Sequence, residues 1–211
     1  MGGHGANHDA MLSEADLLGR HGYGALTLET RACAGALATL GYREVEDLQA
    51  MADFTEKQPG VIKLGALGFS AGSATIIRGA ARLPQIGTVV AEGNYINHYE
   101  EITAVAAPPQ SLEWQIQRLV AVAYALTVGV WPGEVSPVWD LPAISPRPLL
   151  LIHGEKEMGR TRGQEQFAAA GEPKTLWVVP GAGHGEYYKV QPKEYEKRVV
   201  EFFDRYLRLT F

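Results

Sequence analysis

The chain has 211 residues, of which 46% are hydrophobic and 20% charged, and its net charge is −5 at pH 7. This balance indicates one globular domain, argues against intrinsic disorder, and, with no basic run, excludes nucleic acid as an expected partner. The longest apolar stretch, Leu119 to Trp131, is shorter than the roughly 20 residues of a membrane span, and residues 1–5 do not resemble a signal peptide. We therefore expect a cytoplasmic protein without a membrane span.

Helical patterns alternate with short apolar runs along most of the chain. In chain order, the expected elements are a helix at 9–21, a strand at 23–28, a helix at 43–57, a strand at 62–69, a helix at 71–83, a strand at 86–91, a helix at about 112–128, a strand at 148–153, a helix at 163–170, a strand at 175–179 and a helix at 192–207. Such alternation predicts an α/β fold in which helices cover a mostly parallel sheet.

The stretch from Glu92 to Pro146 interrupts this alternation. It is rich in proline and tryptophan, and its one helical pattern, near residues 112–128, is largely apolar. We interpret residues of about 93–140 as an insertion within a single domain that spans residues 1–211.

The sequence Gly68-Phe69-Ser70-Ala71-Gly72 follows an expected strand directly and opens an expected helix. This is the context in which a serine hydroxyl stands out on a sharp turn, because the glycines leave the turn the room it needs. The backbone N–H of Ala71 and the helix dipole would then face a developing oxyanion. We interpret Ser70 as a nucleophile; the alternative is an ordinary glycine-rich turn with a capping serine.

A serine hydroxyl needs a base, and that base needs a carboxylate to orient it. His184 lies in the glycine-rich segment Pro180-Gly181-Ala182-Gly183-His184-Gly185, just after the last expected strand, where it could reach Ser70. The carboxylate could come from Glu155 or Glu157, which follow the fourth expected strand, or from Asp140 or Glu92. The pattern alone does not choose among them.

Three blocks of the sequence resemble the α/β-hydrolase superfamily, in its esterase/lipase and prolyl-oligopeptidase-like branches. They are Leu67–Ser73, Pro148–Gly154 and Pro180–His184, and their order of serine, acid and histidine is also that of the family. The family's acid usually stands three residues after the His-Gly pair that ends its strand, so the resemblance implies a triad of Ser70, His184 and Glu157, with Glu155 as the fallback acid. It implies no metal and no organic cofactor.

The N-terminal segment Gly2–Asn7 resembles the family's oxyanion loop, so the second oxyanion donor would be the backbone N–H of His4, beside that of Ala71. The resemblance also implies that the insertion at about 93–140 forms a small helical cap over the site. Its aromatic side chains, among them Tyr95, Trp131 and Trp139, would line a substrate-binding wall; the alternative is that they only pack the cap onto the core.

The family's sheet usually has eight strands, and its oxyanion loop follows the third, so this chain resembles an N-terminally shortened member with five strands. The missing third strand would lie between the strands expected at 23–28 and 62–69. Three explanations are open: the chain is part of a longer protein, the two strands pair directly, or a second copy covers the exposed surface, which would make the protein a homo-oligomer.

Three functions are compatible with these features. The leading hypothesis is a serine carboxylic ester hydrolase that acts through an acyl-enzyme on a small-molecule substrate, such as a small or short-chain acyl ester. The second keeps the same residues but cleaves an amide bond, as a peptidase or amidase. The third is a non-catalytic remnant of the fold that binds apolar ligands or a partner.

Overall fold

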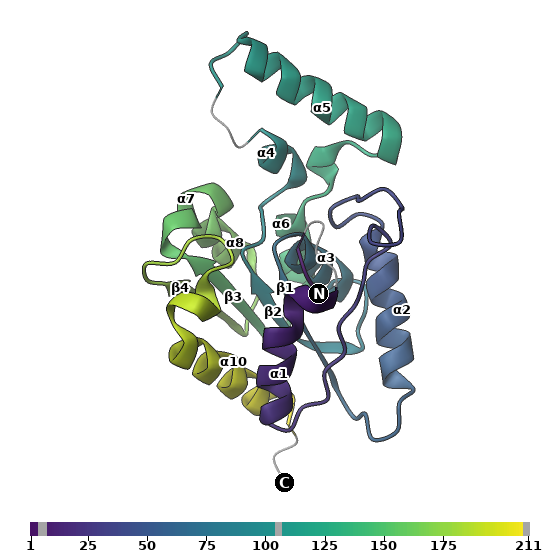
Figure 1. Cartoon of the computed structure of the whole chain (residues 1–211), viewed down its shortest axis with the longest axis vertical. Coiled ribbons are helices and arrows are strands. Elements are labelled where there is room, and N and C mark those ends of the chain that lie inside the picture. The colour runs from purple at the N-terminus through teal and green to yellow at the C-terminus, as the bar shows by residue number, and fades with distance from the viewer. Residues whose placement is uncertain (4–7, 104–106, 209–211) are drawn as a thin grey trace.

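The computed structural model describes residues 1–3, 8–103 and 107–208 of the chain (Figure 1). Two helical elements come first, η1 (His8–Met11) and α1 (Leu12–Arg20), and α2 (Glu44–Glu56) follows. The body of the fold then continues with β1 (Leu64–Phe69), α3 (Ala71–Ala80), β2 (Ile86–Glu92), α4 (His98–Ile102), α5 (Leu112–Val128), η2 (Pro132–Glu134), α6 (Pro137–Asp140), η3 (Leu141–Ile144), β3 (Leu149–Gly154), η4 (Glu155–Glu157), α7 (Met158–Thr161), α8 (Gly163–Ala169), β4 (Lys174–Val179), α9 (Tyr187–Val190) and α10 (Pro192–Tyr206).

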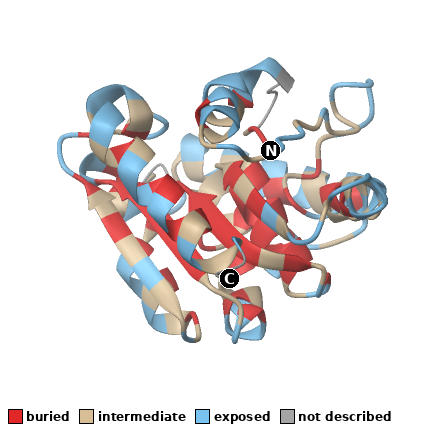
Figure 2. Ribbon diagram, turned by 90° about the horizontal axis from the view of Figure 1, so that it is seen from below, coloured by how far each residue is buried: buried red, intermediate tan, exposed pale blue. Residues whose placement is uncertain are grey.

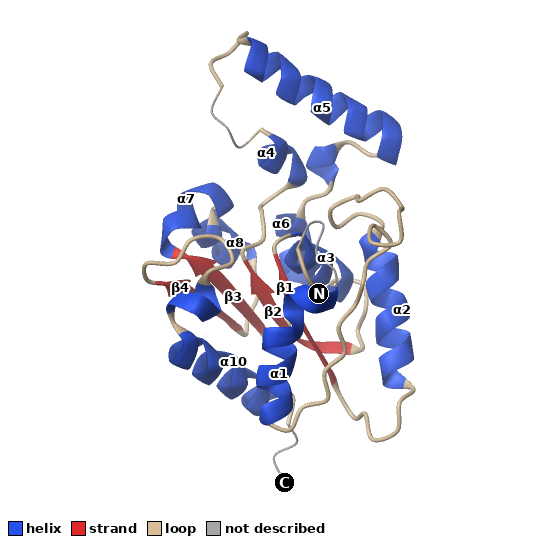
Figure 3. Cartoon of the chain, viewed as in Figure 1, coloured by secondary structure: helices blue, strands red, loops and turns tan. Residues whose placement is uncertain are grey.

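The sheet is parallel throughout its four strands, in the order β1-β2-β3-β4 (Figure 3). Because neighbouring strands run in the same direction, each connection must cross over the sheet, and α3 and α8 lie in two of these crossovers. The carboxyl ends of all four strands therefore meet at one edge. The predicted α/β class, a parallel sheet flanked by helices, is confirmed.

Two apolar clusters hold the helices to the sheet. One cluster joins the strands to α2, α3, η3 and α8, and its buried members include Leu48, Ile76 and Leu141. The other joins the opposite face of the sheet to α1, α9 and α10 through residues such as Leu17 and Tyr195. Figure 2 shows the buried strands between helices whose outer surfaces are exposed. The molecule therefore has three layers, with both faces of the sheet covered.

The prediction of a strand at residues 23–28 is wrong. This segment is irregular chain, and within the described residues its one backbone hydrogen bond runs from the N–H of Tyr23 to the carbonyl of Leu18. An extended segment becomes a strand only when a neighbour pairs with its backbone, and β1 does not lie within hydrogen-bonding reach. The sheet thus has four strands instead of five, and direct pairing of this segment with β1 does not occur.

The segment between β2 and β3 contains α4, α5, η2, α6 and η3. Helix α5 begins where the hydroxyl of Ser111 accepts from the N–H of Trp114 and ends at Gly129, whose φ is 86°. It projects beyond α4 at one end of the molecule (Figure 1). Within the described residues no single helix has the length and apolarity of a membrane span, although α5 together with Pro132–Ile144 meets the length and composition as a pair bent by 74°.

Candidate active site

Ser70 stands on a sharp turn between β1 and α3. Its backbone adopts φ 54° and ψ −119°, a conformation that costs energy for any residue with a side chain. Two glycines make the turn sterically feasible. A Cβ on Gly68 would lie 2.5 Å from Ile76 Cδ1, and a Cβ on Gly72 would lie 2.3 Å from the carbonyl oxygen of Gly2. Both glycines of the predicted motif are therefore required, because neighbouring atoms leave no room for a side chain at these positions. The turn that they allow directs the Ser70 side chain away from the sheet.

His184 comes to Ser70 on the loop that follows β4. Its Nε2 lies 3.1 Å from Ser70 Oγ. The ring of Phe69 packs against the imidazole with a centroid distance of 4.7 Å, and Gly185, with φ 75°, lets the loop pass over that same phenyl ring. The imidazole is thereby held in one orientation, with one nitrogen toward the serine hydroxyl and the other toward the interior.

Glu157 is the carboxylate that meets this histidine. Its Oε2 lies 2.6 Å from His184 Nδ1, while its Oε1 accepts hydrogen bonds from the N–H of Gly154 at 2.8 Å and the hydroxyl of Tyr187 at 2.5 Å. The side chain is only 4% exposed. Burial by itself would raise the pKa of Glu157, but the hydrogen bonds from His184, Tyr187 and Gly154 outweigh burial and hold that pKa below its usual value. The carboxyl group is therefore kept ionised beside the imidazole.

The other candidate carboxylates have different partners. Glu155 is exposed and accepts from the N–H of Gly181. Asp140 forms ion pairs with Arg78 and Arg82, and Glu92 is buried and accepts from the hydroxyl of Tyr195. Of the four carboxylates left open by the sequence pattern, only Glu157 is placed against His184.

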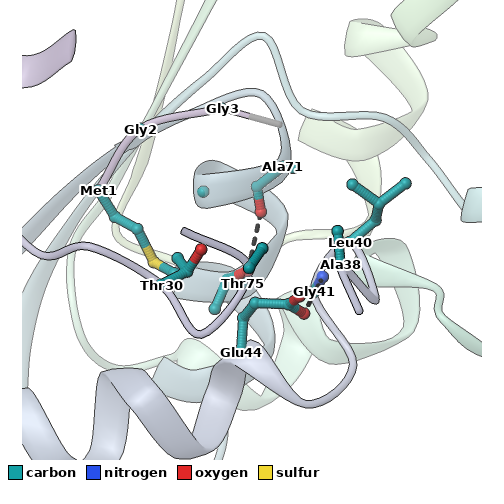
Figure 4. Close-up of a pocket in the computed structure, with 12 residues that line it drawn as sticks. Met1, Gly2, Gly3, Thr30, Ala38, Leu40, Gly41, Glu44, Ala71 and Thr75 are labelled. Atoms are coloured by element: carbon teal, nitrogen blue, oxygen red, sulfur yellow. Dashed lines mark hydrogen bonds between the residues drawn. The ribbon is translucent and has the colours of Figure 1, made fainter. Parts of the chain in front are cut away.

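The oxyanion side of the site is formed by the start of α3 and by the first residues of the chain. The N–H of Ala71 is the first of the helix and so has no partner within it. Gly3 lies against the nucleophile, because a Cβ placed on it would be 3.2 Å from Ser70 Cβ. Figure 4 shows Met1, Gly2 and Gly3 passing Ala71 beside a small cavity of about 20 Å³. The predicted second donor, His4, lies outside the described residues.

A buried layer of ionisable groups lies beneath the site. Burial raises the pKa of Glu92 to about 8, although the hydrogen bond from Tyr195 opposes this shift. Burial likewise lowers the pKa of the Met1 amino group to about 6 and that of His153 to about 4. His153, at the end of β3, is fully buried against Gly163. Burial thus favours the neutral forms of Glu92, the Met1 amino group and His153.

The three aromatic side chains expected to line a substrate-binding wall differ in their exposure and in their contacts. Tyr95 is buried, and its hydroxyl donates to the backbone carbonyl of Leu40, which favours a packing role. Trp131 is partly exposed and packs on the ring of Tyr99. Trp139 lies on α6 with 68% of its surface exposed. None of the three makes a described ring or hydrogen-bond contact with Ser70, His184 or Glu157.

Three residues at the site were not identified from the sequence. Phe69 packs on the imidazole, and Tyr187 donates to the carboxylate. Gly93 leaves room for Tyr187 and His184, since a Cβ there would lie 2.2 Å from the Tyr187 hydroxyl and 3.0 Å from His184. The sequence signal for Phe69 and Tyr187 is only their proximity to Ser70 and His184. Within the described residues, no group of three or more His, Cys, Asp or Glu side chains could hold a metal ion.

This parallel sheet, with a strand–serine–helix turn at its carboxyl edge, defines the α/β-hydrolase fold, and comparison with solved structures shows that the chain has it. The esterase Pf2001 of Pyrococcus furiosus superposes with a TM-score of 0.72 and is 22% identical, over 99% of this chain and 82% of that one. The α/β hydrolase GrgF from Penicillium sp. sh18 gives 0.71 at 17% identity, over 97% and 88%. Dienelactone hydrolase from Anabaena variabilis gives 0.66 at 19% identity, over 98% and 84%.

Sequence comparison reaches less of the chain. An uncharacterized protein of Pseudomonas aeruginosa is 47% identical over 64 residues, which are 30% of this chain and 17% of that protein's length. No protein-family model matches the chain. The predicted α/β-hydrolase fold is thus confirmed by structure, while membership of the superfamily and of its esterase/lipase or prolyl-oligopeptidase-like branch stays a prediction.

Proposed function

We propose that the protein is a serine esterase whose catalytic residues are Ser70, His184 and Glu157. The observation that supports this proposal is the continuous hydrogen-bonded chain from Ser70 Oγ through both imidazole nitrogens of His184 to Glu157 Oε2. Serine hydrolases need this order of contacts, because the imidazole takes the hydroxyl proton at one nitrogen while the carboxylate fixes the tautomer at the other.

The reaction follows from these positions. Ser70 Oγ forms a bond to the ester carbonyl carbon as its proton passes to His184 Nε2, and the carbonyl oxygen becomes an oxyanion. The N–H of Ala71, aligned with the dipole of α3, donates to that oxyanion, and the backbone N–H of His4 is the proposed second donor. The C–O bond to the alcohol then breaks, and the alcohol leaves with the proton from His184.

Water completes the cycle. The water oxygen attacks the carbonyl carbon of the acyl-serine while His184 accepts a proton from the water. The bond between that carbon and Ser70 Oγ then breaks, Ser70 Oγ takes the proton back from His184, and the carboxylic acid is released. Glu157 stabilises the imidazolium that forms in each half-reaction, and the hydrogen bonds from Tyr187 and Gly154 keep this carboxylate ionised. These steps need neither a metal nor an organic cofactor.

The proposed substrates are small or short-chain acyl esters. Two structural neighbours are named as an esterase and a dienelactone hydrolase, which supports ester cleavage ahead of amide cleavage. In this proposal residues of about 93–140 form the cap within the single domain. Trp131, which is partly exposed, is then better placed to meet substrate than the buried Tyr95.

The test compares three reactions of the purified protein. We expect turnover of p-nitrophenyl acetate, slower or no turnover of an aminoacyl p-nitroanilide, and covalent labelling of Ser70 by a fluorophosphonate probe. The substitution Ser70→Ala should abolish all three. Anilide turnover without ester turnover would indicate a peptidase or amidase. A folded protein that neither turns over ester nor labels at Ser70 would indicate a non-catalytic binding protein, and ester turnover that survives S70A would exclude the proposed nucleophile.

A further inference from the structure

Helix α5 carries an apolar face that is exposed. The side of this helix that packs on the rest of the chain includes Ala121 and Val128, which are buried. On the opposite side stand four large apolar side chains that are between 50% and 83% exposed, namely Leu112, Ile116, Leu119 and Leu126. A surface helix normally presents polar residues to water, so an exposed apolar face of this size indicates a contact surface.

The spacing of this face is typical of a helix that packs against another helix. The exposed residues follow one another at intervals of four, three, four and three positions, in the order Leu112, Ile116, Leu119, Ala123 and Leu126. Such an alternation places apolar residues on one narrow stripe, as the a and d positions of a coiled coil do. We call these five residues the α5 seam. Its pattern indicates that the surface receives a second helix.

The charges of α5 disfavour a lipid surface as its partner. Helices that lie on membranes carry several Lys and Arg residues on their polar side, where these cations meet anionic headgroups. Helix α5 has one cation, Arg118, and one anion, Glu113, and the guanidinium of Arg118 lies over the ring of Trp114 at 3.9 Å from its centroid. The chain as a whole has a net charge of −5. An apolar seam without surplus positive charge therefore fits a protein partner better than an anionic membrane.

A second copy of α5 complements the seam when the two helices run antiparallel. With a twofold axis at the level of residue 121, Leu119 of each copy lies beside Ala123 of the other, so that a large side chain meets a small one. Ile116 of each copy then lies beside Leu126 of the other. The two edges of the seam are also apolar in this register, because each meets its own counterpart across the axis: Val120 on one edge and Val122 on the other. The exposed apolar residues of α5 are thus self-complementary.

The size and position of α5 suit such a contact. Its 17 residues make a helix about 25 Å long, and pairing along the whole seam buries on the order of 1,000 Å² in total. This area lies at the low end of specific interfaces, so we expect a reversible dimer with a dissociation constant in the micromolar range. Because α5 projects beyond α4 at one end of the molecule, two copies can meet through this helix while their sheets stay apart (Figure 1).

We propose that the α5 seam is a dimerisation surface, on which α5 of a second copy of the chain packs in the antiparallel direction. The contact is isologous, since the same residues of both copies form it. It lies on the segment between β2 and β3 and leaves both faces of each sheet covered as they are in the single chain. This inference does not depend on the proposed esterase activity.

The test follows the mass of the whole chain by sedimentation equilibrium from micromolar to submillimolar concentrations. Leu119→Glu places a carboxylate at the centre of the seam. Its matched control is Phe54→Glu, which adds the same charge at a residue of α2 with similar exposure, 57% against 65%. The double variant Leu119→Glu with Ala123→Lys places opposite charges side by side only if the helices are antiparallel. Flotation with vesicles of phosphatidylcholine and phosphatidylglycerol tests for a lipid surface instead.

We expect the unmodified chain and F54E to pass from monomer to dimer over this range. L119E should weaken dimerisation by about 100-fold or more, because two unpaired carboxylates would be buried, and the double variant should recover at least about tenfold of that loss. An unmodified chain that stays monomeric, or L119E that dimerises as tightly as F54E, would overturn the proposal. A double variant no tighter than L119E would exclude the antiparallel contact. Vesicle binding by a monomeric chain, lost in L119E, would assign the seam to lipid.

Discussion

The two ends of β1 are built in opposite ways. At its carboxyl end the chain is packed so tightly that glycines at 68 and 72 are required, and Ser70, His184 and Glu157 form one hydrogen-bonded chain. At its amino end the same strand borders a groove of about 630 Å³, with the backbone of Gly65 facing it. The difference shows that the contacts that hold Ser70, His184 and Glu157 together lie at one edge of the sheet.

The largest expected effect concerns the carboxylate at the packed end. Glu157→Gln should lower kcat for p-nitrophenyl acetate by about 10³–10⁴-fold, because the amide would stabilise the wrong tautomer of His184 and would not balance the imidazolium. Glu155→Gln removes a charge only two residues away and should leave kcat close to that of the unmodified protein. Steady-state kinetics of the two variants checks this, and a larger loss in E155Q would reassign the acid.

Paired substitutions compare the stability of the two ends directly. Ile76, which is 1% exposed, fills the space beside Gly68, whereas Ile62 borders the groove and is 74% exposed. Ile76→Ala should lower the free energy of unfolding by about 2–5 kcal/mol, and Ile62→Ala by no more than about 0.5 kcal/mol. Urea unfolding measures both. Similar losses in the two variants would mean that the groove is closed in solution and that the contrast is wrong.

A smaller effect is expected from the hydroxyl that anchors the acid. Tyr187→Phe leaves Glu157 Oε1 with the Gly154 N–H alone, and a hydrogen bond to a charged group contributes about 1.5–3 kcal/mol. We expect kcat to fall about tenfold with KM nearly unchanged. Because the pKa of Glu157 rises in this variant, the acidic limb of the pH–activity profile should move to higher pH. Tyr188→Phe is the matched control, and a loss of equal size there would indicate a general packing defect.

A further prediction concerns the dependence of stability on pH. Glu92 has a folded-state pKa of about 8, above its ordinary value of 4.5, so the folded protein keeps a proton that the unfolded chain releases. Its contribution to stability is therefore present below about pH 4.5 and is lost as the pH rises toward 8. The free energy of unfolding of Glu92→Gln, minus that of the unmodified protein, should therefore rise between about pH 4.5 and pH 8 and stay constant above that pH. Thermal unfolding at several pH values checks this, and a constant difference would contradict it.

The residues with distinctive local chemistry were predictable from the sequence. The strand–turn–helix context placed Ser70, and a glycine-rich loop after the last strand placed His184 beside it. The helix expected at about 112–128 coincides with α5, which the structure shows to begin after a capping serine and to end at a glycine. Each of these signals is local, because the neighbouring residues impose the backbone conformation that the prediction uses.

Features that depend on distant partners were not predictable. Residues 23–28 have the apolar pattern of a strand, but a strand also needs a neighbour within hydrogen-bonding distance. The choice of Glu157 over Glu155 rested on a family resemblance, since both follow the same strand; the structure separates them by the direction each side chain takes. The inward hydroxyl of Tyr187 depends on the space left by Gly93, which lies 94 positions earlier in the sequence and carries no pattern of its own.

Met1, on the oxyanion side of the site, is linked to the turn that carries Ser70. Its carbonyl accepts from the N–H of Phe69, the residue immediately before Ser70, so any force applied to the first residue reaches the nucleophile through one hydrogen bond and one peptide unit. An affinity tag or a surface tether fused ahead of Met1 would therefore act on the reactive turn itself. Immobilising the protein through its C-terminus, after α10, would leave that turn unloaded.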